Sequence, residues 1–298
     1  MGVAKIRTYE QDATQFLETT HFLEALAIFA NLLEKHEQVI NDLNVYPVPD
    51  SDTGTNSLLT IRAGLAGQLT PELGLGDAAG QVGALASAGA MGNSGVILAQ
   101  YLVGLASELP DKATQQDWAG ALKVASQVAR AAVLSPEEGT MLTVAQAALI
   151  ALPSENFESY FRQVQREVRA SLICTQEMLP ALKLAEVVDA GGVVITLLHD
   201  SFAQVVGVVT DPLEILPRSG LVEKYDGAKF EVMFSVSCNL ETKESLEKAL
   251  LTLGDSIALA GTQPNFTVHV HSNDPSAVIE ACERLVELSD IRIIEFGS

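Results

Sequence analysis

Two aspartates stand two residues apart in the segment "NVYPVPDSDTGTN", residues 44–56: Asp50 and Asp52. The prolines at 47 and 49 fix φ and lack an amide donor, so we expect a loop rather than a helix here. Both carboxylates can point to the same side of such a loop. Hard oxygen ligands held close together suit Mg²⁺, which binds through one or two carboxylates plus substrate phosphates. The alternative, from these residues alone, is an Asx-turn that leads into a capped helix.

The residues directly after the aspartates predict the start of a helix, with Asp52 or Thr53 as its N-cap. Free amides at a helix N-terminus, together with the helix dipole, form an anion site. A metal site beside an anion site supplies the parts that phosphoryl transfer needs. A second turn, "GNSG" at 92–95, could cradle a phosphate through Asn93, Ser94 and the backbone amides. A plain turn between two helices remains the alternative.

Two further motifs place polar residues beside glycines. In "EEGTMLTV", Gly139 and Thr140 precede a predicted helix, and in "VDAGG" Asp189 precedes two glycines. Each could border a nucleotide, or be no more than a helix cap or helix end.

A third group of side chains suggests a different metal. His269 and His271 are two residues apart on a predicted strand, so both face the same side. Cys238 ends another predicted strand that could lie alongside. Three such ligands form a zinc site with a fourth position left for water or substrate. The alternative is a surface histidine pair beside a small buried cysteine.

The elements that must position these residues fall into two blocks. Apolar residues at helical spacing predict helices through most of 1–208, and we expect this to be one helical domain. Residues 209–220 carry two prolines and a glycine and are expected to be a linker. Residues 221–298 alternate strand and helix patterns, which indicates a small α/β domain.

The composition limits the partners. The chain has 38 acidic and 18 basic residues, a formal charge of −20, which repels nucleic acid and anionic membranes. No apolar run reaches the roughly 18 residues that a spanning helix needs. Three cysteines are too few, and odd in number, for a disulfide framework. We therefore expect a cytoplasmic protein without a nucleic acid partner or membrane insertion.

Five segments occur in the same order in the bacterial fatty acid kinases, which this chain resembles over nearly its whole length: "LNVYPVPDSDTGTN", "GNSGVILAQ", "EGTMLTV", "EMLPALKLAEVVDAGG" and "HVHSNDP". The first domain is similar to the nucleotide-binding subunit of dihydroxyacetone kinases. The resemblance implies an all-α antiparallel barrel of about eight helices that binds ATP with two Mg²⁺, followed by the α/β domain. It also implies an activity in phospholipid metabolism, in which the carboxylate of a fatty acid on a separate carrier protein becomes an acyl phosphate.

Carried over residue by residue, the resemblance makes Asp50 and Asp52 the catalytic, magnesium-binding pair. The positions that it places near the nucleotide are Asn44, Thr53, Gly54, Thr55, Asn56, Gly92, Asn93, Ser94, Gly139, Thr140 and Asp189. In the family's middle domain a similar cysteine and histidine pair bind zinc, which assigns zinc to Cys238, His269 and His271.

The chain departs from the family pattern at three places. Ser51 stands where the family usually has glycine, Met91 stands where it usually has arginine, and "DAGGVV" replaces "DAGGQG". A serine costs roughly 1–2 kcal/mol if that position is left-handed. The family's catalytic chains usually continue into a carrier-docking domain, so this chain is either a fragment or a two-domain relative.

Two other functions stay open at this point. The acceptor could be a hydroxyl of dihydroxyacetone or a related ketose, or the protein could bind nucleotide and metal for regulation without turnover. A homodimer through the second domain is compatible with the resemblance, although no stretch of the sequence indicates it.

Overall fold

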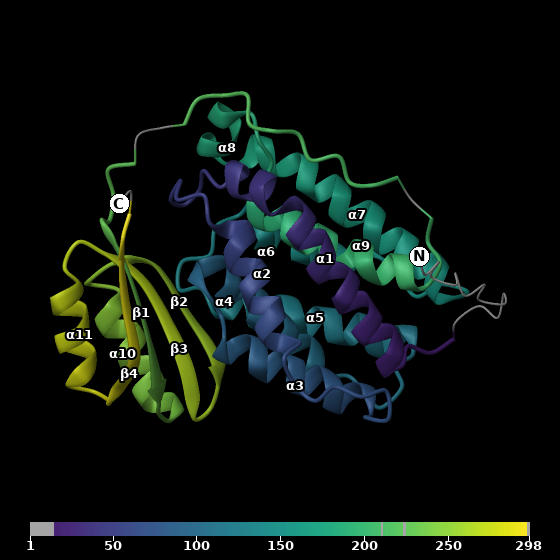
Figure 1. The fold of residues 1–298 in the computed structure, drawn as a ribbon, viewed down its shortest axis with the longest axis horizontal. Coiled ribbons are helices and arrows are strands. Elements are labelled where there is room, and N and C mark those ends of the chain that lie inside the picture. The colour runs from purple at the N-terminus through teal and green to yellow at the C-terminus, as the bar shows by residue number, and fades with distance from the viewer. Residues whose placement is uncertain (1–14, 210, 223–224, 297–298) are drawn as a thin grey trace, which may run out of the picture.

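The computed structural model describes residues 15–209, 211–222 and 225–296. Its first part is a block of helices, and its second part is a small sheet with two helices (Figure 1). The helices of the block are α1 (Thr19–Leu43), α2 (Thr53–Gly64), α3 (Leu75–Ala88), α4 (Gly92–Ala106), α5 (Gln115–Ala131), α6 (Met141–Ala147), the 3₁₀ turn η1 (Ala148–Ile150), α7 (Phe157–Met178), α8 (Pro180–Ala185) and α9 (Ala190–Val205).

The helices pack because each buries an apolar stripe. In α1 the residues that predicted the helix, Phe22, Leu26, Phe29, Leu33 and Ile40, are all buried. Helix α9 is buried all round, from its first residue to position 203, so it lies inside the block. Neighbouring helices touch in a circuit that runs from α1 through α2, α4, α5, α6, α7 and α9 back to α1.

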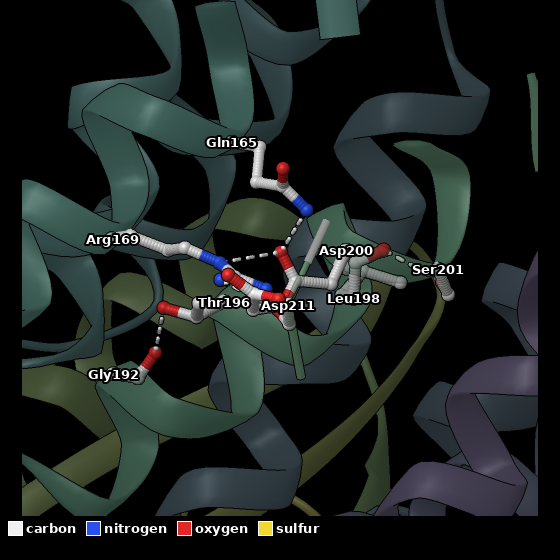
Figure 2. Close-up of polar contacts among 8 residues, drawn as sticks. All are labelled: Gln165, Arg169, Gly192, Thr196, Leu198, Asp200, Ser201 and Asp211. Carbon is white, nitrogen blue, oxygen red and sulfur yellow. Dashed lines mark hydrogen bonds and ion pairs between the residues drawn. The ribbon is translucent and has the colours of Figure 1, made fainter. Parts of the chain in front are cut away.

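A buried polar cluster joins α7, α9 and the segment that follows α9 (Figure 2). The Asp200 carboxylate accepts hydrogen bonds from Gln165 (2.7 Å) and from Arg169, whose Nη2 lies 2.7 Å from Oδ2. Arg169 also donates to the backbone carbonyl of Asp211 at 3.0 Å. Because a buried charge must be paired and hydrogen-bonded, this cluster fixes where the connecting segment leaves α9.

The connecting segment then runs along the helical block toward α8 (Figure 1). Near its end the amides of Gly220 and Leu221 donate to the carbonyls of Ala185 (2.9 Å) and Leu184 (3.1 Å). That residues 1–208 and 221–298 fold as separate domains joined by a linker at 209–220 stays a prediction.

The second part is a four-stranded antiparallel sheet in the order β2-β3-β1-β4. Its elements are β1 (Phe230–Ser237), α10 (Leu240–Leu250), β2 (Asp255–Thr262), β3 (Asn265–Ser272), α11 (Pro275–Glu283) and β4 (Leu288–Glu295). This is the βαββαβ order of the ferredoxin-like unit.

The two faces of the sheet have different partners. One face packs on α10 and α11 through a core that includes Val232, Phe234 and Leu246. The opposite face, called the inner face below, lies against the helical block, and Ala258 and Ala260 of β2 belong to the core of that block. Side chains alternate along a strand, so every second residue of β1 and β3 faces the helices. None of the helices in the described ranges is long and apolar enough to span a membrane.

Candidate functional site

A cavity of about 520 Å³ lies between the helical block and the inner face of the sheet. This volume is in the range of small-molecule sites. Its walls come from the proline loop at 44–52, the start of α4, the segment before α6, the start of α9 and the inner face. Asp50 and Asp52 both line it.

The proline loop is braced by Asn44, a buried residue at the end of α1. Its amide nitrogen donates to the carbonyl of Val48 at 2.9 Å and to the Asp50 carboxylate, and its oxygen accepts from the Thr53 hydroxyl. Ser51 has a φ of 57°, so the serine occupies the left-handed position that glycine usually fills. Asn44 therefore acts on Asp50 by holding it in place.

The two aspartates repel each other in a poorly solvated place. Burial raises the pKa of Asp50 to about 8, with further contributions from the charges of Asp52 and Glu231. Burial and the charge of Glu231 also raise the pKa of Asp52, while a hydrogen bond from the Asn56 side chain opposes that rise. A divalent cation would stabilise such a pair of carboxylates, because its charge offsets their mutual repulsion and replaces the solvation that they have lost.

The start of α2 differs from the sequence prediction. The amides of Gly54 and Thr55 do not face the cavity, because both donate to Oδ1 of Asn41 on α1, at 2.7 and 3.2 Å. The Thr55 hydroxyl donates to Glu37 at 2.6 Å, again toward α1. The structure therefore removes Gly54 and Thr55 from the predicted phosphate-binding set. Thr53 does line the cavity.

The start of α4 has the open anion site instead. The first bond inside this helix runs from the Gly95 amide to the Met91 carbonyl at 3.0 Å, which leaves the amides of Gly92, Asn93 and Ser94 without an acceptor in the helix. All three of these residues line the cavity. The Asn93 Oδ1 is buried and has no hydrogen-bond partner within the described ranges.

Gly92 is required at this turn by its backbone and by its neighbour. Its φ is +58°, and a Cβ at this position would collide with the side-chain amide of Asn56. Asn56 itself does not line the cavity. Its side chain lies against Gly92 and makes a hydrogen bond with the Asp52 carboxylate. The Met91 side chain lies beside β4, where its sulfur is 3.0 Å from Nη1 of Arg292.

Asp189 joins the starts of two helices at the cavity's edge. It is buried, and its carboxylate accepts from the amides of Gly192, at 2.6 Å, and Met141. Burial raises its pKa to about 7, although both amides oppose the shift. Thr140, the N-cap of α6, also lines the cavity, whereas Gly139 does not.

The inner face of the sheet forms the wall opposite the aspartates. His269, His271 and Glu231 are almost completely buried and line the cavity. His269 Nδ1 is 3.1 Å from Glu231 Oε1, and its Nε2 is 3.0 Å from His271 Nε2. Burial and the neighbouring His269 lower the pKa of His271. The sequence prediction missed Glu231, for which the signal was a single charged residue in a strand pattern.

The predicted zinc set is not assembled. His269 pairs with Met233 and His271 with Glu231, while Cys238 follows the far end of β1, where its amide bonds the Pro264 carbonyl. Cys238 also packs with the core on the opposite face of the sheet. In the part of the chain that the structure describes, no three His, Cys, Asp or Glu side chains come together as a metal site. The structure therefore does not bring Cys238 to the two histidines, and the predicted zinc site of these three residues is not formed.

The remaining donor set fits Mg²⁺ better than zinc. Asp50 and Asp52 supply hard oxygen atoms, and open amides for phosphate oxygens lie across the same cavity. The described residues that line the cavity include no lysine or arginine and six carboxylates: Asp50, Asp52, Glu137, Asp189, Glu231 and Asp255. An anionic ligand can therefore enter only with cations that offset this charge.

Two family models match this chain, one over the helical block and one over the sheet domain. Residues 47–204 match the model of the DAK2 domain, and residues 227–297 match that of the FakA-like middle domain of fatty acid kinases. Protein YloV of Bacillus subtilis is 30% identical over 93% of this chain and 55% of its own length. An uncharacterised protein of Staphylococcus saprophyticus is 30% identical over 91% of this chain and 54% of its own. The chain thus spans about half the length of the curated relatives it matches.

Solved structures resemble the fold. A dihydroxyacetone kinase from C. freundii in complex with AMP-PNP and Mg²⁺ superposes with a TM-score of 0.51 and 18% identity, over 68% of this chain and 37% of that one. Its native form gives a TM-score of 0.50 and 16% identity. At such low identity the likeness concerns the fold alone.

Proposed function

This chain belongs to the DAK2 domain family and carries a FakA-like middle domain of the fatty acid kinase type, and on that premise we propose that it is an ATP-dependent kinase. It transfers the γ-phosphoryl group to the carboxylate of a fatty acid that a separate carrier protein presents, and the product is an acyl phosphate. The proposal includes a cytoplasmic location and a role in phospholipid metabolism. The observation that carries it is that Asp50, Asp52 and the open amides of α4 meet in one cavity.

Each group has a distinct task in this proposal. Asp50 and Asp52 would hold Mg²⁺, and the ion would supply positive charge that offsets the charge of the phosphates. The amides of Gly92, Asn93 and Ser94 receive phosphate oxygens, as helix N-termini do. A closed circuit of contacts among seven of the helices fits the antiparallel helical barrel that the resemblance implies, for which about eight helices are expected.

The remaining wall residues border the nucleoside and the acceptor. Thr140 and Asp189 lie on the side of α6 and α9, and the inner face of the sheet lies opposite the aspartates. An ionised fatty acid carboxylate needs no base to attack a phosphoryl group. The two histidines on the inner face would therefore orient the reactants rather than remove a proton.

One observation favours a second acceptor class. A hydroxyl acceptor profits from a general base, and His269 and His271 bring imidazoles to the cavity from the second domain. A dihydroxyacetone-type kinase is therefore the second candidate.

A transfer assay with γ-labelled ATP separates these functions. The protein is incubated with Mg²⁺ and either a fatty-acid-loaded carrier or dihydroxyacetone, and an acyl phosphate is recognised because hydroxylamine converts it to a hydroxamate and releases the labelled phosphate. We expect the label on the fatty acid, and its loss in Asp52→Asn. Label on dihydroxyacetone alone supports the second candidate. Tight Mg-ATP binding with no transfer to either acceptor refutes both kinases and leaves a regulatory nucleotide-binding protein.

A further inference from the structure

An arginine of the last strand, Arg292, lies beside the turn that offers open amides to a ligand. Its Nη1 is 3.0 Å from the sulfur of Met91, which is the N-cap residue of α4. Gly92 follows Met91 directly and lines the cavity. A guanidinium from the sheet domain therefore stands next to the candidate phosphate site of the helical block.

The register of the sheet explains how Arg292 reaches this place. Arg292 on β4 lies directly opposite Met233 on β1, and Met233 lies opposite His269 on β3. Directly opposed residues of antiparallel strands point to the same face, so Arg292 shares the inner face with His269, which lines the cavity. Arg292 is exposed just outside this wall, where a ligand can reach it.

The positive charge of Arg292 is not neutralised by the part of the chain that the structure describes. The Met91 sulfur is an uncharged, weak acceptor, and it takes only one of the five N–H donors of the guanidinium. No described carboxylate forms an ion pair with Arg292, although six carboxylates line the neighbouring cavity. Arg292 thus keeps its charge and most of its donors available to an anion.

We propose that Arg292 is a phosphate-binding residue that the sheet domain contributes to the nucleotide site. When a nucleotide binds with Mg²⁺, the guanidinium leaves the Met91 sulfur and donates to a phosphate oxygen held by the open amides of α4. The inference rests on the proposed function for the identity of the anion. An arginine suits this task, because its planar fork of donors matches phosphate oxygens and stays charged.

The distances allow this contact. The covalent path from the Met91 sulfur to the Gly92 amide spans at most about 8 Å. A phosphate on that amide is therefore within range of an exposed arginine side chain that turns about its own bonds. The contact also brings a cation to a site whose described lining contains no lysine or arginine.

Calorimetry with Mg²⁺ and a nonhydrolysable ATP analogue tests the contact. We expect Arg292→Gln to weaken the affinity about tenfold or more, because it loses a hydrogen bond between charged groups. Arg292→Lys keeps the charge without the fork and should recover part of the loss. Added salt should narrow the difference between Arg292→Gln and the unaltered protein. Their melting temperatures in EDTA should be nearly equal, because the side chain is exposed.

Arg284→Gln is the matched control, because it removes the same charge from the same domain. Arg284 is the C-cap of α11, which packs on the face of the sheet away from the cavity, and it forms a surface pair with Glu280 at 3.8 Å. We expect Arg284→Gln to bind the analogue as tightly as the unaltered protein.

Chemical protection of the unaltered protein supplies a second measurement. Phenylglyoxal modifies accessible arginines, and mass spectrometry of the digested protein reports each arginine separately. We expect Mg²⁺ with the analogue to slow the modification of Arg292 and to leave that of Arg284 unchanged.

Three results would overturn the inference and leave the proposed function standing: full affinity in Arg292→Gln, an equal loss in Arg284→Gln, or no protection of Arg292. If the unaltered protein binds no nucleotide with Mg²⁺, the proposed function fails and the inference fails with it. If it binds the nucleotide but phosphorylates no acceptor, the proposed function fails, while the affinities still decide the role of Arg292.

Discussion

Replacing Asp50 with asparagine should make the metal-free protein more stable and abolish its response to Mg²⁺. Asparagine keeps an oxygen that can accept from Asn44, as the aspartate does. It removes a carboxyl whose pKa is raised from 3.8 to about 8 by burial, by Asp52 and by Glu231. A carboxylate needed only for folding would give the opposite result.

The sign follows from proton binding. Between pH 4 and 8 the folded protein holds a proton on Asp50 that the unfolded chain has released, so stability falls as pH rises through this window. The full shift bounds the penalty at about 6 kcal/mol above pH 8. Asp52 shares the repulsion and the Asp50 carboxyl keeps some solvent, so the real penalty is smaller than this bound. We expect Asp50→Asn to raise the free energy of unfolding by about 2 kcal/mol, which corresponds to about 4–6 °C in melting temperature.

The assay is thermal unfolding at pH 6 and pH 8.5, in EDTA and in Mg²⁺ with a nonhydrolysable ATP analogue. In EDTA the variant should melt higher than the unaltered protein, and more so at pH 8.5. Mg²⁺ with nucleotide should raise the melting temperature of the unaltered protein and leave Asp50→Asn unmoved. Asp42→Asn, an exposed carboxylate on α1, is the control and should change stability by less than about 0.5 kcal/mol. A variant that melts lower in EDTA, or gains as much from Mg²⁺ as the unaltered protein, would refute the reasoning.

Three other substitutions test single parts of the structure. Gly92→Ala should lower the free energy of unfolding by about 1–2 kcal/mol because the backbone is left-handed there, and it should weaken Mg-nucleotide binding measured by calorimetry. The control Gly120→Ala, on an open helix surface, should be neutral or stabilising. Equal nucleotide affinities for the two variants would contradict a phosphate-binding role for the turn at Gly92. Arg169→Ala should cost about 3 kcal/mol in urea unfolding, because it leaves a buried carboxylate unpaired, whereas Arg166→Ala breaks only a surface pair; similar losses would contradict the cluster's role. Asn41→Ala should cost about 1 kcal/mol in the same assay, through its loss as the cap of α2, and an unchanged midpoint would contradict that.

The parts of the fold that could be predicted are those decided by neighbours in the sequence. Helix α1 followed from the spacing of its apolar residues, and the loop at 44–52 from its prolines, since both signals act over a few residues. The placement of Asp50 and Asp52 on one cavity wall likewise needed only their separation of two.

The parts that could not be predicted depend on contacts between distant segments. Asn41 takes the amides of Gly54 and Thr55, and nothing near those residues shows that α1 passes close enough to do so. Cys238 lies far from the histidines because of the strand register, which the pattern of single strands leaves open. Glu231 was missed for the same reason, because its partner stands 38 positions later on β3.

The carboxylate-lined cavity has a consequence for how such a protein would be governed in a cell. Its described lining has six carboxylates and no lysine or arginine. The cavity therefore attracts cations and repels a triphosphate that carries no metal ion. Occupancy would then track the supply of free divalent ions more closely than the total adenylate pool. Depleting magnesium at constant nucleotide would empty the cavity, while extra nucleotide, by sequestering the ion, would act as an inhibitor.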